Sequence, residues 1–189
     1  MQLKRKRATQ FLNRKEGSTV IEFAIAAPIL FLLLMGTVET GLVLFANSVL
    51  EGATGFASRV GKSGFTLNGM TREQYIRDRI QTLSAGLLRP NQITITTLAY
   101  SNFANIGQPE PCITAAPCNG APGVNYQDIN GNGTRDMDQG RSNAGGSGDV
   151  VVYRVTYPWP IFTPLVRRAF SSNGTLTLTA VTTVRNEAF

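Results

Sequence analysis

The sequence has 189 residues, and none of them is histidine. Without an imidazole, Ser-His and Cys-His nucleophilic catalysis are excluded, because both use it as the general base. Most zinc sites are excluded as well, since histidine is among their usual ligands. No other nucleophile–base pair and no phosphate-binding glycine loop is visible in the chain. We therefore expect a protein that is not an enzyme.

Cysteine is nearly absent too. Only Cys112 and Cys118 occur, in a proline-rich loop. Their spacing is not the C-x-x-C pattern of redox motifs, and no further metal ligands stand beside them. If this part of the chain is exported, it lies in an oxidising compartment, where we expect the two cysteines to form a disulfide. Such a small ring restricts its own loop rather than the whole fold.

Basic charge is concentrated at one end of the chain. Residues 1–17 hold six Lys/Arg and one acidic residue, for a net +5, whereas the other 172 residues hold twelve basic and eleven acidic residues, for +1. A basic tail ahead of an apolar segment is the positive-inside signature of a membrane protein with a cytoplasmic N-terminus. Because the excess charge is confined to this tail, we do not expect a nucleic-acid partner.

A long apolar segment follows the basic tail. No formal charge occurs over the sixteen residues from Phe23 to Val38. The helical pattern runs from Ser18 to about Lys62, and its first half can enter a bilayer core about 30 Å thick. A signal peptide would have a shorter apolar core with a small-residue cleavage site behind it. We therefore predict one membrane-spanning helix, with the remainder of the chain beyond the membrane.

A second, shorter helix is predicted over Thr71 to Leu87. Thr71 and Gln74 form a capping-box pattern at its start. Gly86 and Pro90 are the residues that end it. The apolar side chains that recur at helical spacing form one face of this helix: Ile76, Ile80, Leu83 and Leu87.

Three segments have the composition of β-strands, namely residues 93–96, 150–157 and 175–184. In the last of them, apolar residues alternate with threonines and form one face: Leu176, Leu178, Ala180 and Val184. We expect a small antiparallel sheet with one face covered by helix. The predicted fold class is α+β, with a long N-terminal helix, a second short helix, and a small antiparallel β-sheet with a long irregular loop.

The predicted organisation has three parts. Residues 1–17 are a cytoplasmic leader, residues 18–62 a helix with a transmembrane first half, and residues 63–189 an exported α+β domain. That domain contains an irregular stretch over residues 102–148, dense in Gly, Asn and Pro. A loop of this length is usually functional or disordered.

One segment of this loop resembles a calcium site. From Asp128 the sequence matches D-x-N-x-N-G, the first half of a calcium loop, with Gly133 allowing the sharp turn. The oxygen donors would be spaced at alternate positions: Asp128, Asn130, Asn132, Thr134 (through its carbonyl), Asp136 and Asp138. However, the twelfth position is Gln139 rather than a bidentate glutamate. The alternative is a polar Asn/Gly turn cluster without an ion.

The segment Tyr157 to Phe162 is apolar and rich in proline. If exposed, it would be a patch for a partner or a membrane. We favour the alternative, in which the segment closes over the core of its own domain.

A motif stands at the entrance to the apolar helix: Gly17-Ser18-Thr19-Val20-Ile21-Glu22-Phe23. A charge in a lipid-facing segment is costly, so a residue such as Glu22 is usually functional and paired. Gly-x-x-x-x-Glu-Phe after a basic leader resembles the processing site of type IV pilin-like proteins. The alternative is an ordinary signal-anchor in which Glu22 sits at the level of the lipid headgroups.

The wider pattern resembles the TadE-like proteins of tight-adherence (Flp-type) pili. The resembling segments are Val20-Ile21-Glu22-Phe23-Ala24, Pro28-Ile29-Leu30, Glu39-Thr40-Gly41 and Arg59. The last six residues, from Val184 to Phe189, are similar to that family's usual ending, Arg-Asn-Glu-Pro-Phe. Ala188 stands where proline is usual, and Thr40 where an apolar residue is common. The resemblance is strong over residues 14–62 and at the C-terminus, and weak between them.

The resemblance implies that a membrane-embedded prepilin peptidase cuts between Gly17 and Ser18, which makes Glu22 the fifth residue of the product, beside Phe23. It implies a minor pilin or pseudopilin that assembles with other pilins and with the inner-membrane machinery of a tight-adherence pilus. The chain would lie in the inner membrane with its C-terminal domain in the periplasm, or in the fibre at the cell surface. The alternatives are an uncleaved, membrane-anchored assembly factor and a tethered calcium-dependent binding domain.

Glu39 is the second carboxylate of the helix. It follows Glu22 by seventeen residues, which places it roughly 25 Å further along the helix, near the periplasmic membrane surface. We expect either a solvated helix residue or a contact between subunits.

Overall fold

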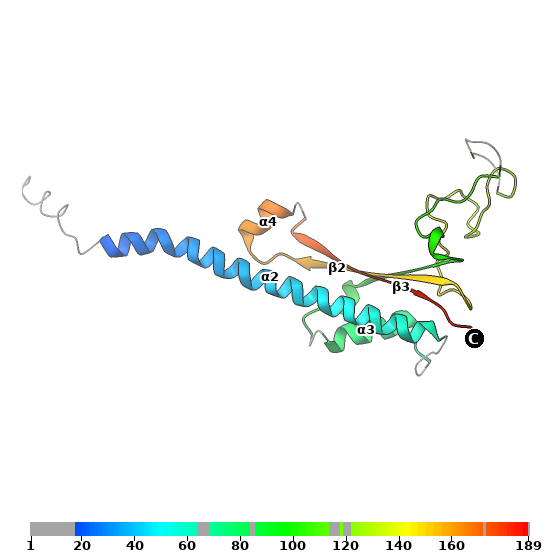
Figure 1. The fold of residues 1–189 in the computed structure, drawn as a ribbon. Coiled ribbons are helices and arrows are strands. Elements are labelled where there is room, and N and C mark those ends of the chain that lie inside the picture. Colours follow the sequence, from blue (N-terminus) through cyan, green and yellow to red (C-terminus); the bar gives the residue numbers. More distant parts are fainter. Residues whose placement is uncertain are drawn as a thin grey trace, which may run out of the picture.

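The computed structural model describes residues 18–63, 69–83, 86–113, 118, 122–171 and 173–188. The basic leader, with Gly17, lies outside the described residues. A long helix, a shorter second helix and a three-stranded antiparallel sheet make up most of the described structure (Figure 1). The predicted α+β fold class is therefore confirmed.

The long helix α2 comprises Ser18–Lys62, 45 residues in an unbroken run. Large apolar side chains are exposed along its first half, and none of the residues in its most apolar window is buried. Its length and composition are sufficient for it to span a membrane. Arg59 and Lys62 stand in its last turn, where positive charge interacts favourably with the helix dipole.

The second half of α2 belongs to the hydrophobic core of the domain. It lies along the sheet, and the second helix α3 (Arg72–Leu83) packs beside it (Figure 1). Small and apolar residues at helical spacing face the sheet from α2: Ala46, Val49, Leu50 and Ala53. Opposite them, the sheet contributes alternate residues, as a strand with one buried face must: Val151, Tyr153, Val155, Tyr157, Trp159, Leu178 and Ala180.

The sheet has the strand order β1-β2-β3, with β1 at Thr94–Tyr100, β2 at Val150–Pro160 and β3 at Thr175–Arg185. Both pairings are antiparallel, and Val155 stands between Ile95 and Ala180. Pairing with β1 ends at Thr156, so the rest of β2 is an edge on that side. Because an edge strand tolerates missing N–H donors, β2 can continue through Pro158 and Pro160.

The capping box predicted for α3 is confirmed. The N–H of Thr71 donates to Oε1 of Gln74 at 2.9 Å, and the N–H of Gln74 donates to Oγ1 of Thr71 at 3.2 Å. The predicted end of the helix was wrong, because α3 stops at Leu83 and Leu87 lies in a bend. The chain turns back toward α3 there, with Arg77 donating to the carbonyl of Pro90 at 2.8 Å.

A short helix that the sequence analysis did not predict, α4 (Pro164–Phe170), connects β2 to β3. Its first residue is proline, whose fixed φ and missing N–H suit the start of a helix. Seven residues are too few for a helical period to be recognised. Alternate residues of the preceding apolar segment belong to the core, as predicted, since Tyr157, Trp159 and Ile161 are buried. Pro158, Pro160 and the last residue, Phe162, are exposed.

Candidate functional site

The structure places the predicted processing motif at the very start of α2. Ser18 is the first residue of the helix, and Gly17 lies outside the described residues. Glu22 and Phe23 follow within two turns, and both are exposed. The scissile bond predicted from the sequence would therefore lie directly before an α-helix.

An apolar surface continues from this motif along the first half of α2. The exposed side chains come from all sides of the helix, since all seven apolar residues from Ile29 to Met35 are exposed. A surface of this kind requires lipid or other apolar helices around it. The first half of α2 is thus built for contacts outside its own domain, and the second half for contacts within it.

The carboxylate of Glu39 marks the transition between these halves. Only 8% of the residue is exposed. Its Oε1 accepts from the N–H of Phe162 at 2.7 Å, and its Oε2 from the N–H of Thr163 at 3.2 Å. Glu39 therefore ties the chain after β2 to the middle of α2. This geometry differs from the solvated position that was one of the two expectations for Glu39.

The C-terminal segment holds the other end of α2. The N–H of Glu187 donates to the carbonyl of Lys62 at 2.8 Å, and the two side chains form an exposed ion pair at 3.1 Å. Asn186 is buried, and its Nδ2 donates to the carbonyls of Ala144 and Gly146 at 3.1 and 2.9 Å. The Arg-Asn-Glu ending thus fixes β3, the loop before β2 and the end of α2 together.

The candidate calcium residues form a turn cluster that is closed by its own hydrogen bonds. The two carboxylate oxygens of Asp128 accept from the N–H groups of Gly131 and Gly133 at 2.7 and 2.8 Å. Oδ2 of Asp136 accepts from the side-chain amides of Asn130 and Asn132, both at 2.5 Å. The remaining two candidates make other hydrogen bonds: the hydroxyl of Thr134 donates to Oδ1 of Asn132 within the cluster, and Asp138 accepts from Tyr100 outside it.

Within the described part of the chain, no three His, Cys, Asp or Glu side chains lie close enough together to hold a metal ion. The hydrogen bonding matches the alternative that the sequence left open, a polar Asn/Gly turn cluster. Calcium binding stays a prediction.

The side chain of Glu110, which is not among the site residues predicted from the sequence, holds this turn cluster in place through hydrogen bonds. It is fully buried, and its Oε1 accepts from the N–H of Ile129 at 2.7 Å. Its Oε2 accepts from the N–H of Asp136 at 3.2 Å, so one side chain joins both ends of the turn. The flanking prolines, Pro109 and Pro111, were the available signal, since they keep this residue out of helix and sheet.

A second polar contact fixes the end of the same loop. The hydroxyl of Tyr100 donates to the carboxylate of Asp138 at 2.9 Å. Burial and this hydrogen bond raise the pKa of Tyr100 to about 12. Further along the loop, Cys112 and Cys118 lie at disulfide distance, with Cα atoms 5.5 Å apart, as the sequence predicted.

The described residues contain one candidate membrane helix, whose second half is built into an α+β domain. The model of the family described as TadE-like protein matches residues 17–59. This match confirms the resemblance to TadE-like proteins from Gly17 to Arg59, the segment that holds most of α2 and the predicted processing motif. Comparison with curated proteins and with solved structures gave no match.

Proposed function

We propose that this protein is a minor pilin or pseudopilin of a tight-adherence pilus, processed after Gly17 by a prepilin peptidase. The observation that carries the proposal is the division of α2 into an exposed apolar half and a half buried against the sheet. That division falls within a segment that matches a TadE-like family model. The precursor would lie in the inner membrane with the leader in the cytoplasm and the domain in the periplasm.

The cut changes the electrostatics of the chain. It removes a leader of net charge +5 and leaves a product that carries +1 from its side chains. The leader would hold the N-terminus on the cytoplasmic side, because moving that many charges through a bilayer is prohibitively costly. Without it, the new amine of Ser18 lies about one helical turn from Glu22.

Assembly would then pair charges between neighbouring helices. An isolated carboxylate in an apolar bundle is costly and would take up a proton or be expelled. The amine of Ser18 on one subunit would neutralise Glu22 on the next and thereby set the register between the subunits. The exposed apolar side chains of α2, Phe23 among them, would fill the space between the helices.

The test is the intact mass of the protein in membrane and sheared-pilus fractions. The wild-type chain should lose its 17 leader residues, and the Gly17→Arg variant should keep them and fail to support piliation. The matched control is Asn13→Arg, which adds the same charge to the leader but leaves the glycine in place. If the wild-type chain keeps its leader and the Gly17→Arg chain supports piliation equally well, the protein is an uncleaved assembly factor instead.

A further inference from the structure

The connection from β2 to β3, residues 161–174, lies beside the point at which α2 would leave the membrane. A hydrocarbon core of about 30 Å takes roughly 20 helical residues, which is the run from Thr19 to Val38. Glu39 follows directly and binds the N–H groups of Phe162 and Thr163. The start of residues 161–174 is therefore fixed at the level of that membrane boundary.

Apolar side chains of this connection are exposed. Phe162 is 59% exposed and Leu165 is 60% exposed. A third, Val166, contributes to a groove of about 640 Å³ between α4 and α2. The α2 side of that groove is mostly apolar or small: Leu32, Leu33, Gly36, Thr37, Thr40, Gly41 and Leu44. The groove thus continues the exposed apolar surface of α2 to the base of α4.

The hydroxyl groups in this groove are already satisfied. Thr37 donates to the carbonyl of Leu33 and Thr40 to the carbonyl of Gly36, each at 2.8 Å. Neither hydroxyl therefore leaves an unsatisfied donor facing an apolar ligand. An acyl chain is a chemically suitable occupant of such a groove.

Residues 161–174 also carry a localised positive charge. They contain Arg167 and Arg168, both exposed, and no acidic residue. The rest of the chain after the leader then holds ten basic and eleven acidic residues, for a net charge of −1. Arginine forms bidentate hydrogen bonds with phosphate, and its long stem lets the head reach the interface from an apolar position. This charge complements an anionic lipid surface.

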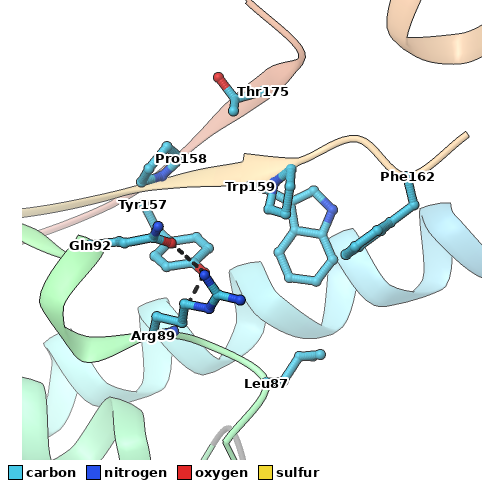
Figure 2. A pocket seen from close by; sticks show the side chains of 9 residues that line it. Leu87, Arg89, Gln92, Tyr157, Pro158, Trp159, Phe162 and Thr175 are labelled. Atoms are coloured by element: carbon cyan, nitrogen blue, oxygen red, sulfur yellow. Dashed lines mark hydrogen bonds between the residues drawn. The ribbon is translucent and has the colours of Figure 1, made fainter. Parts of the chain in front are cut away.

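Two aromatic side chains, Trp159 and Phe162, are in contact near the same membrane boundary. Trp159 is 1% exposed and meets Phe162 edge to face, with ring centroids 6.0 Å apart. Figure 2 shows the two rings next to each other on the α2 side of β2. The indole N–H of Trp159 has no hydrogen-bond partner among the described residues. Trp159 belongs to the core, and its contact with Phe162 places a fluorescent side chain directly beside the exposed apolar residues of this connection.

We propose that residues 161–174 dock on the outer surface of the membrane that α2 spans. Phe162 and Leu165 enter the headgroup region, and Arg167 and Arg168 bind lipid phosphates. This inference rests on the proposed membrane insertion of α2. The contact gives the domain one orientation on the bilayer, because Glu39 joins it rigidly to the helix, and it is released when the subunit leaves the membrane.

The experiment uses the full chain in vesicles of anionic and zwitterionic phospholipid, with its single tryptophan, Trp159, as the probe. Lipids brominated near the headgroup should quench its fluorescence more than lipids brominated near the end of the acyl chain. A chain that is stripped from the vesicles by alkaline carbonate contradicts the membrane helix and, with it, this contact. A chain that stays inserted while neither lipid quenches Trp159 contradicts the contact alone.

A pair of matched variants tests the role of the two arginines. Arg167→Gln with Arg168→Gln should lower quenching in anionic vesicles by roughly twofold or more, since each basic residue near such a surface contributes to binding. Arg59→Gln with Arg154→Gln removes the same charge from exposed positions elsewhere and should leave quenching unchanged. Equal loss in both pairs would indicate general attraction by net charge and overturn the proposed site.

A photo-crosslinking amino acid in place of Leu165 distinguishes lipid from protein in cells. The proposal predicts adducts with phospholipid in the membrane fraction. An adduct of protein size at this position, without lipid adducts, would assign the surface to a partner subunit and overturn the proposal.

Discussion

Glu39 and Glu110 each place a buried carboxylate where backbone N–H groups of an irregular segment converge. An irregular segment lacks the regular ladder of a helix or a sheet, so its backbone donors need partners of another kind. A carboxylate is suited to this because it only accepts, and its charge strengthens each bond. At both sites one carboxylate supplies the hydrogen-bond acceptors that a helix or a sheet would otherwise provide for these N–H groups.

Replacing Glu110 with glutamine should destabilise the turn over residues 128–139. The amide turns one acceptor oxygen into a donor facing a backbone N–H, and an unsatisfied buried group costs about 1–3 kcal/mol. Amide hydrogen exchange of this segment, followed by mass spectrometry, should become faster. Glu51→Gln, at an exposed position of α2, is the control. Unchanged exchange in Glu110→Gln would mean that the turn holds itself together.

The phenol of Tyr100 should titrate at about pH 12 instead of 10. Because folding favours its neutral form, the stabilisation is fully present below pH 10 and is lost as the pH rises toward 12. Ultraviolet absorbance of tyrosinate measures the titration. Asp138→Asn should bring one tyrosine back toward the ordinary value, since it removes the charge that accepts the phenolic proton. A titration curve identical to wild type would contradict this assignment.

At the scale of elements, the end of α2 is held by two contacts of different strength. The ion pair between Lys62 and Glu187 is about half exposed on both sides, and such pairs contribute about 0–1 kcal/mol. Asn186 is buried and satisfies two carbonyls of the loop before β2. Most of the stabilisation from the C-terminal segment should therefore come from the amide and little from the ion pair.

We predict that Asn186→Ala lowers the free energy of unfolding by about 1–3 kcal/mol, because two carbonyls lose their donors. Glu187→Gln, one residue further on, should change it by less than about 1 kcal/mol. Denaturant unfolding of the full chain in detergent compares the two. The ranking is the test: a larger effect of Glu187→Gln would show that charge, and not the buried amide, holds this end.

At the scale of the whole molecule, α2 carries two kinds of surface on one helix. The core needs only its second half, so changes in the first half should affect assembly and not folding. Glu22→Ala should leave the free energy of unfolding within about 0.5 kcal/mol of wild type. It should reduce the pilus-associated fraction roughly tenfold or more, because the amine of a neighbouring Ser18 would lose its partner, and breaking a buried pair costs several kcal/mol.

The comparison for this prediction is Glu51→Ala, which removes an exposed carboxylate from the same helix outside the uncharged run. Quantitative immunoblots of sheared and cell-bound fractions measure incorporation. Equal incorporation of the Glu22→Ala and Glu51→Ala chains into the sheared fraction would contradict a role of Glu22 in assembly.

Features encoded locally were predictable from the sequence. The bounds of α2 follow from the helical run of apolar residues, and the start of α3 from Thr71 and Gln74 three residues apart. The strand of alternating apolar residues and threonines also appears as predicted, although Leu176 is exposed near the end of the sheet. Periodicity, caps and turn residues act over a few positions, so a short window of sequence contains them.

Contacts between distant residues were decided only by the tertiary structure. Glu39 and Phe162 are 123 positions apart, and no local pattern links them. The same holds for Glu110 under its turn and for Asn186 beside the loop before β2. By itself, the sequence determined an apolar helix with a basic leader and predicted a processing motif at their junction. Only folding decided that Glu39 and Glu110 accept hydrogen bonds from within the chain, because their N–H partners lie in distant segments that the packed domain brings within reach.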